Sequence, residues 1–336
     1  MPLDLIDILH TVCASPDAAV QLLSQYMPVT TDALGNVLGT RGLNDAQENA
    51  QDGLSFDRAT TDHAAAPRLL LEAHLDTVGF ILTQKDGDGP YKFANVGGAD
   101  VRALPGARVT FAGHPGVISA VPPHLKKDDD KLDLDAMRVD LGGIDLPVGT
   151  RGGFASAFHS DGRRVIAPGL DDRAGVAAVL YALSLVPKEI PLMVCFAAQE
   201  ELGTRGAGVA AFALQPTQAL AVDVSFGDTP DAPVHKCGKL GEGPMVGISP
   251  ALDKEMTDAL LQLAGEHCQR EVMAGKTGTD ADALALAREG VATALVSIPL
   301  RYMHTPSETV DVEDVKAVGE LLAAYAAQLH ENGEAQ

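Results

Sequence analysis

The stretch Pro191-Leu-Met-Val-Cys-Phe-Ala-Ala-Gln-Glu-Glu201 is an apolar run that ends at two adjacent carboxylates, Glu200 and Glu201. Its length and lack of charge predict a buried strand, so the two acids begin where that strand emerges. Because neighbouring side chains on an extended backbone point to opposite faces, we expect the two acids to point in different directions. Burying an unpaired carboxylate is costly, so the pair requires a compensating positive charge nearby.

Strand-like and helix-like segments alternate on both sides of this stretch. The pattern predicts further strands at 68–73, 219–224, 245–248 and 292–298, and helices at 172–186, 252–268, 280–288 and 312–328. Two short helices within residues 3–27, a strand pair within 30–39 and a polar exposed loop at 41–67 complete the N-terminal part. This alternation favours an α/β fold with helices layered on both faces of a mixed sheet.

The segment from Gly79 to Phe154 has a different texture. Short strand-like pieces at 80–84, 91–96, 107–112 and 116–121 are separated by Gly, Pro and Asp, and no long helical pattern occurs. The charge run at 126–131 reads as a solvated loop. We therefore predict a small all-β domain at 79–154, inserted between the two parts of the larger domain at 1–78 and 155–336.

Composition narrows the class of protein. The chain has 336 residues, is 46% hydrophobic and carries a formal net charge of −21. Such a charge disfavours nucleic acid and anionic lipid as partners. No apolar stretch is long enough to span a bilayer, and the N-terminus lacks the pattern of a secretory signal, so we expect a cytoplasmic protein. Four widely spaced cysteines read as reduced thiols.

Histidine and acidic residues recur where predicted strands end or helices begin. Each alone has a simple structural explanation, such as a helix cap or a turn acid. Together they lie where open α/β sheets bind ligands, and they are ligand types for borderline divalent metals. The residues are His74, Asp76, Asp171, Asp172, Glu200, Glu201, Asp223 and His304.

The number of these residues favours two metal ions. One zinc site needs three or four ligands, whereas His74, Asp171, Glu201, Asp223 and His304 supply five. If one carboxylate bridges, the five make two three-ligand sites that share an activated water. Glu200 then serves as the base for that water, and Asp76 accepts the second N–H of His74 and fixes its tautomer.

These motifs resemble the M42 metallo-aminopeptidases, the tetrahedral and glutamyl aminopeptidases once described as endoglucanases. The resemblance covers residues 1–328 and rests on HLDTVG at 74–79, LDDRAG at 170–175, QEELGTRGA at 199–207, VDVSFGDTP at 222–230 and RYMHTP at 301–306. Thr77 departs from the Glu that the family often has there.

The resemblance implies a role for each candidate residue. It makes Asp171 the bridging ligand, gives His74 and Asp223 to one metal, gives Glu201 and His304 to the other, and makes Glu200 the general base. It also implies a cis peptide bond after Asp171. The two metals are zinc by preference, with cobalt and manganese also compatible.

The resemblance further implies removal of N-terminal residues from short peptides by a homo-oligomer. In this reading the inserted β domain forms dimers, which assemble into a dodecamer or a hexamer. Other amide hydrolysis by a dinuclear metal centre, such as deacylation, is the alternative. A second alternative is glycoside hydrolysis by paired carboxylates, but it would give the two histidines no role. A third is an inactive scaffold, which would not require all five ligands.

Overall fold

The computed structural model describes residues 4–42, 68–87, 89–125, 132–230 and 232–334. Most of the polar loop expected at 41–67 and the charge run at 126–131 lie outside these residues. Within them, no helix is both long enough and apolar enough to cross a membrane.

A mixed sheet forms the centre of the larger part of the chain. Its path among the described residues runs β1-β2-β12-β3-β13-β16-β17-β11-β10, and β14 and β15 extend it from β16. The central strands β12, β3, β13 and β16 are parallel, so their carboxyl ends meet at one edge. The strands are β1 (Val29–Thr31), β2 (Val37–Arg41), β3 (Leu69–His74), β10 (His159–Ser160), β11 (Arg164–Ile166), β12 (Leu192–Ala197), β13 (Gln218–Phe226), β14 (Met245–Ile248), β15 (Gln269–Val272), β16 (Ala292–Arg301) and β17 (Thr309–Asp311).

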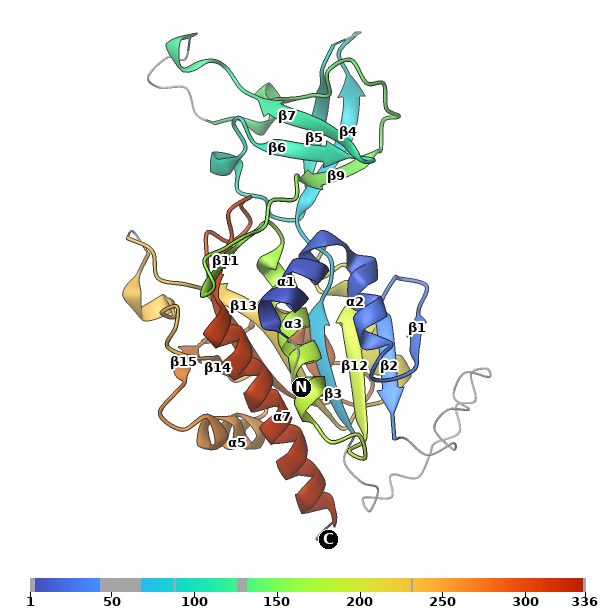
Figure 1. Ribbon diagram of the computed structural model, residues 1–336, viewed down its shortest axis with the longest axis vertical. Helices are drawn as coiled ribbons and strands as arrows, with labels where there is room; N and C mark the ends of the chain where they lie inside the picture. Colours follow the sequence, from blue (N-terminus) through green and yellow to red (C-terminus); the bar gives the residue numbers. More distant parts are fainter. Residues whose placement is uncertain (1–3, 43–67, 88, 126–131, 231, 335–336) are drawn as a thin grey trace.

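Helices cover both faces of this sheet, which confirms the predicted α/β layering. The side chains of Leu71 and Val222 pack on one face with α1, α3 and α7, and those of Leu70 and Ala221 pack on the other with α4 and α6. Figure 1 shows α1, α3 and α7 together on the near side of the strands. The helices are α1 (Leu5–Ala14), α2 (Pro16–Leu23), α3 (Leu170–Leu185), α4 (Arg205–Leu214), α5 (Lys254–Ala264), α6 (Ala281–Ala285) and α7 (Val312–Glu334).

The strands between Gly79 and Phe154 close into a small antiparallel barrel at one end of the molecule (Figure 1). The barrel has its own core, which includes the fully buried Phe80, Val109 and Phe111. The expectation of a small all-β unit inserted into the chain is therefore confirmed. The barrel strands are β4 (Gly79–Lys85), β5 (Tyr91–Val96), β6 (Arg108–Phe111), β7 (His114–Ser119), β8 (Arg138–Asp140) and β9 (Arg151–Phe154).

Some elements differ from the sequence expectations. Helix α6 covers only Ala281–Ala285, whereas α7 continues six residues past the predicted end at 328. Helix α4 and the short strands β10, β11, β15 and β17 were not predicted, because their short or Gly- and Ala-rich segments carry little periodic signal.

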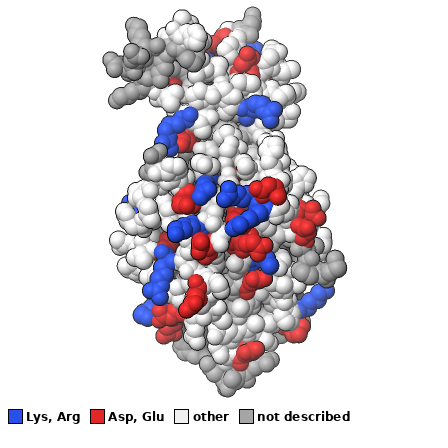
Figure 2. Space-filling model, turned by 60° about the vertical axis from the view of Figure 1, so that its left-hand side comes forward, with Lys and Arg blue, Asp and Glu red and all other residues white. Residues whose placement is uncertain are grey.

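The surface mixes charges of both signs despite the net negative charge. Figure 2 shows Lys and Arg side chains beside Asp and Glu side chains on one face. Ion pairs such as Arg163–Asp311 at 2.7 Å and Arg301–Asp228 at 2.6 Å join distant segments.

Candidate metal centre

The fold brings all five predicted ligands to the carboxyl edge of the parallel strands. His74 is the last residue of β3, and Asp223 lies near the end of β13, one strand away. Asp171 is at the start of α3, Glu201 follows β12, and His304 follows β16. Residues separated by up to 230 positions thus converge because four parallel strands end together.

Asp171 lies between the two histidines. Its Oδ1 is 3.0 Å from Nε2 of His74, and its Oδ2 is 3.1 Å from Nε2 of His304. His74 Nε2 also lies 3.9 Å from Asp223, and His304 Nε2 lies 3.5 Å from Glu201. One carboxylate therefore faces both halves of the cluster, each of which has its own histidine and a further acid.

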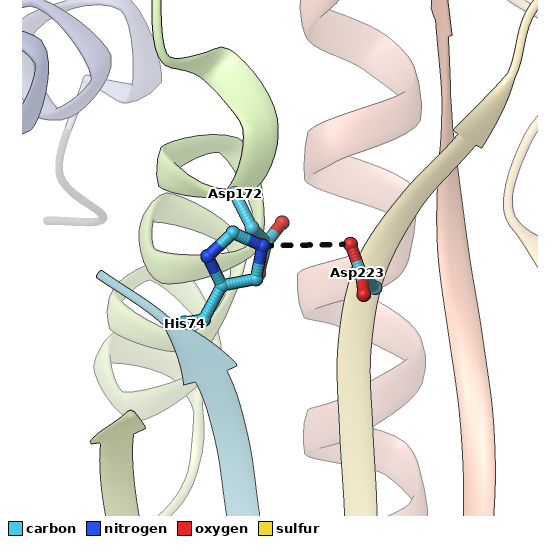
Figure 3. Close-up of side chains that lie close together, drawn as sticks. All are labelled: His74, Asp172 and Asp223. Atoms are coloured by element: carbon cyan, nitrogen blue, oxygen red, sulfur yellow. Dashed lines mark ion pairs between the residues drawn. The ribbon is translucent and has the colours of Figure 1, made fainter. Parts of the chain in front are cut away.

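A sixth residue, the acid Asp172, approaches the same cluster. Figure 3 shows its carboxylate beside His74 and across from Asp223, and the ligand atoms of these three residues lie within 4.8 Å of one another. Asp171, Glu201 and His304 make a second group of the same compactness. Oδ1 of Asp172 accepts the N–H of Gly175 at 3.0 Å, so Asp172 also caps the first turn of α3. The peptide bond between Asp171 and Asp172 is cis, as expected.

Both imidazoles are oriented through Nδ1 by main-chain carbonyl groups. Nδ1 of His74 is 3.0 Å from the carbonyl oxygen of Asp76, and Nδ1 of His304 is 2.9 Å from that of Gly98. When each Nδ1 carries the proton and donates it, each Nε2 presents a lone pair to the carboxylate cluster. The expected acceptor for His74 was the Asp76 carboxylate, but its nearer oxygen is 3.7 Å away.

The Asp76 carboxylate instead holds the segment that carries the paired acids. It accepts the N–H of Glu200 at 3.0 Å and that of Glu201 at 3.3 Å. Strand β12 ends at Ala197, and Gln199 has φ +65°, so the chain turns before the acids are reached. The expectation that Glu200 and Glu201 diverge because they continue an extended strand was therefore wrong, since their directions are set by a turn.

Glu308 is a buried acid that the sequence analysis did not single out. Its two oxygens accept the N–H of Asp171 at 3.2 Å and the N–H of His304 at 2.7 Å. One side chain thereby fixes the backbone of two residues from the two halves of the cluster. The only sequence signal is its position four residues after His304, which by itself predicts nothing.

The electrostatics of the cluster fit cation binding. Burial raises the pKa of Glu200 and of Glu201 to about 7, and the charge of Asp171 adds to the effect on Glu201. Burial also raises the pKa of Asp223 and of Asp172 well above the ordinary value. Without a cation the site therefore holds protons that a divalent metal would displace.

The pKa of Asp171 moves the other way. Burial alone would raise it, but hydrogen bonds from His304 and His74 hold it well below its ordinary value. The bond to Asp171 raises the pKa of His304 to about 9. Oε1 of Glu201 and Oδ2 of Asp172 are buried without a hydrogen-bond partner among the described residues. Buried oxygens without a partner, imidazoles whose Nε2 can present a lone pair and one carboxylate shared by both histidines together suit borderline divalent metal ions.

A second buried acidic pair, which the sequence analysis also missed, interacts electrostatically with His74. Glu72 on β3 and Asp280 at the start of α6 are only 1% and 2% exposed. Burial and the charge of Asp280 raise the pKa of Glu72 well above its ordinary value. An acid within the otherwise apolar run at 69–73 was the available signal.

Comparisons with known proteins find relatives among the aminopeptidases. The sequence model of a family described as M42 glutamyl aminopeptidase matches residues 58–321. A lysyl aminopeptidase from Pyrococcus furiosus is 32% identical over 79% of this chain and 83% of its own length.

Two solved structures show the same fold. An aminopeptidase from the archaeon Desulfurococcus kamchatkensis has a TM-score of 0.83 and 26% identity, covering 96% of this chain and 94% of that one. The TET1 peptidase of Pyrococcus horikoshii, which can assemble into a tetrahedron or a large octahedral shell, has a TM-score of 0.78 and 25% identity, with coverages of 96% and 99%.

Proposed function

The chain belongs to the M42 family of aminopeptidases, and from this premise we propose that it removes N-terminal residues from short peptides with a dinuclear metal centre. The family makes it a peptidase. The position of Asp171, within 3.1 Å of both histidines, is the observation that carries the dinuclear proposal.

The proposed ligand sets follow the two halves of the cluster. His74 and Asp223 would hold one ion, Glu201 and His304 would hold the other, and Asp171 would be the ligand that they share. Two such ions, zinc by preference, would supply a water whose pKa is lowered towards ~7 and a positive charge that polarises the scissile carbonyl. The Asp172 carboxylate belongs to the first group of ligand atoms and also caps α3. We therefore regard it as an additional carboxylate beside the first site.

Glu200 is the proposed general base. The turn that Asp76 holds leaves the Glu200 carboxylate outside both ligand groups. Burial raises the pKa of Glu200 to about 7 in the metal-free protein, so this carboxylate can accept a proton. Glu200 takes the proton from the attacking water and returns it to the leaving amine. The surrounding acids attract the positive α-amine of the peptide, which favours cleavage of the first peptide bond.

The division of the chain is part of the same proposal. Residues 1–78 and 155–336 form the catalytic part, and the barrel at 79–154 serves for dimerisation. We propose that such dimers assemble further, as the TET1 peptidase of Pyrococcus horikoshii can. Sedimentation of the metal-loaded protein, with and without chelator, measures the size of the assembly.

A panel of aminoacyl reporter substrates tests the reaction. The protein is chelated, reconstituted with zinc, cobalt or manganese in turn, and assayed with each reporter. We expect chelation to abolish hydrolysis and a divalent ion to restore it. A glycoside hydrolase would survive chelation and cleave none of these reporters.

Two substitutions separate the proposed roles of the adjacent acids. Glu200→Gln is expected to retain both metals while losing at least about a hundredfold in turnover. Glu201→Ala is expected to lower the metal content itself, measured by elemental analysis of the dialysed protein. Near-normal turnover of Glu200→Gln contradicts the assignment of the base.

A further inference from the structure

The acidic side chain of Glu271 is hydrogen-bonded to two residues that neighbour the metal ligand Asp223, but it has no part in the proposed chemistry. It comes from β15, the outermost strand beyond β14. Its Oε1 accepts a short hydrogen bond from the hydroxyl of Ser225, and its Oε2 accepts one from Ser297 at 2.8 Å. Both serines are buried, with 7% and 1% of their surface exposed.

Sheet geometry places this carboxylate on the same face as Asp223. Ser225 lies two residues after Asp223 on β13, and side chains two apart on a strand point the same way. Ser297 on β16 is the register partner of Asp223, and paired residues of adjacent strands share a face. The Glu271 carboxylate therefore contacts two residues next to the metal ligand Asp223, namely Ser225 on β13 and Ser297 on β16.

Among the described residues, the charge of Glu271 has no basic partner. No ion pair joins Glu271 to a Lys, Arg or His side chain within 4.0 Å in the part of the chain that the structure describes. Each serine hydroxyl fills one acceptor position on an oxygen that can accept two hydrogen bonds. A neutral side chain would be enough to tie β15 to β16. Glu271 is only partly buried, so its negative charge can attract a cationic group of a bound ligand.

The distances fit the side chain of a bound peptide. Two residues along a strand cover about 6.6 Å, so Ser225 lies about that far from Asp223 along β13. The ammonium group of an extended lysine lies about 6 Å from its own Cα atom. A peptide whose first residue is held at the metal centre can therefore extend a basic side chain to Glu271.

We propose that Glu271, held by Ser225 and Ser297, selects peptides whose N-terminal residue is lysine or arginine. The proposal rests on the aminopeptidase function proposed above and names its substrate class. Glu271 acts on the side chain of that first residue, and it takes no part in the cleavage step.

The test compares kcat/KM for lysyl, arginyl, leucyl and glutamyl p-nitroanilides in the metal-loaded wild type and in Glu271→Gln. The wild type is expected to prefer the two basic substrates. Glu271→Gln keeps the size of the side chain and is expected to lower the lysyl-to-leucyl ratio by about ten- to hundredfold, the range of one charge-assisted hydrogen bond. Glu266→Gln, which removes an exposed charge after α5, is the matched control and should keep the wild-type ratio.

The possible results have distinct meanings. An unchanged ratio in a folded, metal-loaded Glu271→Gln protein overturns this inference alone. If that variant does not fold, the salt dependence of the wild type decides, because only a charge-dependent preference for lysyl over leucyl substrates falls as salt rises. A wild type that cleaves no member of the panel refutes the aminopeptidase proposal itself.

Discussion

In metal-free protein prepared by chelation, the free energy of unfolding should decrease as pH rises from about 5 to 8. The groups responsible are those of the metal cluster. In the folded, metal-free protein the pKa of Glu201 is about 7 and that of Glu308 about 8, both from an ordinary value of 4.5, and that of His304 is about 9 from 6.5.

The sign of the effect is the same for all three groups. Each folded pKa is raised, so between the ordinary and the raised value the folded protein binds more protons than the unfolded chain, and stability drops with pH. For Glu201, whose side chain is only 6% exposed, the shift of about 2.5 units amounts to about 3 kcal/mol, lost between pH 4.5 and 7. The pKa of Asp171 is lowered, so the contribution of this group to stability is lost only at acidic pH. It does not change the profile between pH 5 and 8.

Urea unfolding of the chelated protein at a series of pH values measures this loss. About 3 kcal/mol is a substantial part of the stability of an ordinary domain. Metal-loaded protein should show a flatter profile, because the ions replace the bound protons. Glu201→Gln should reduce the loss between pH 4.5 and 7 by about 3 kcal/mol but not abolish it, because Glu200 and Glu308 also titrate in this range. The exposed Glu313→Gln should leave the loss unchanged. A chelated protein whose stability stays constant or increases from pH 5 to 8 refutes the reasoning.

Three further substitutions test how the site is held. Glu308→Ala leaves two buried N–H groups without an acceptor and should cost about 2–6 kcal/mol in urea unfolding, with metal affinity about 10–100 times lower by titration. Asn36→Ala, which unpairs the N–H of Ala198 and the carbonyl of Gly206, should cost about 2–4 kcal/mol in the same measurement. Asp76→Asn keeps one acceptor for the turn of the paired acids and should reduce kcat more than metal content; equal losses of both would contradict a positioning role.

The general position of the site could be predicted because strand ends are visible in the sequence. The apolar run before His74 and the run before Asp223 each identify a strand, and parallel strands present their carboxyl ends at one edge. Residue type then limits the chemistry, since His and carboxylate together indicate a borderline metal. Neither step required the distances between the residues of the site.

What escaped prediction depends on turns and on contacts between distant segments. The direction of Glu200 and Glu201 follows from a left-handed residue at Gln199, which local propensity does not reveal. The role of Glu308 depends on the backbone N–H of Asp171, 137 positions away. Glu271 was missed because β15 is short and lacks alternation, so nothing in the sequence placed it beside Ser225.

The loop that follows β5 gives the barrel a role inside the larger domain. The carbonyl of Gly98 accepts from the imidazole of His304 at 2.9 Å, and the N–H of Asp100 donates to the carbonyl of His304 at 3.0 Å. Deleting the inserted segment would therefore remove hydrogen bonds to His304. A protein engineer who replaced residues 79–154 with a short linker would delete the group that sets the tautomer of His304, and grafting another β domain would require a carbonyl at the same place.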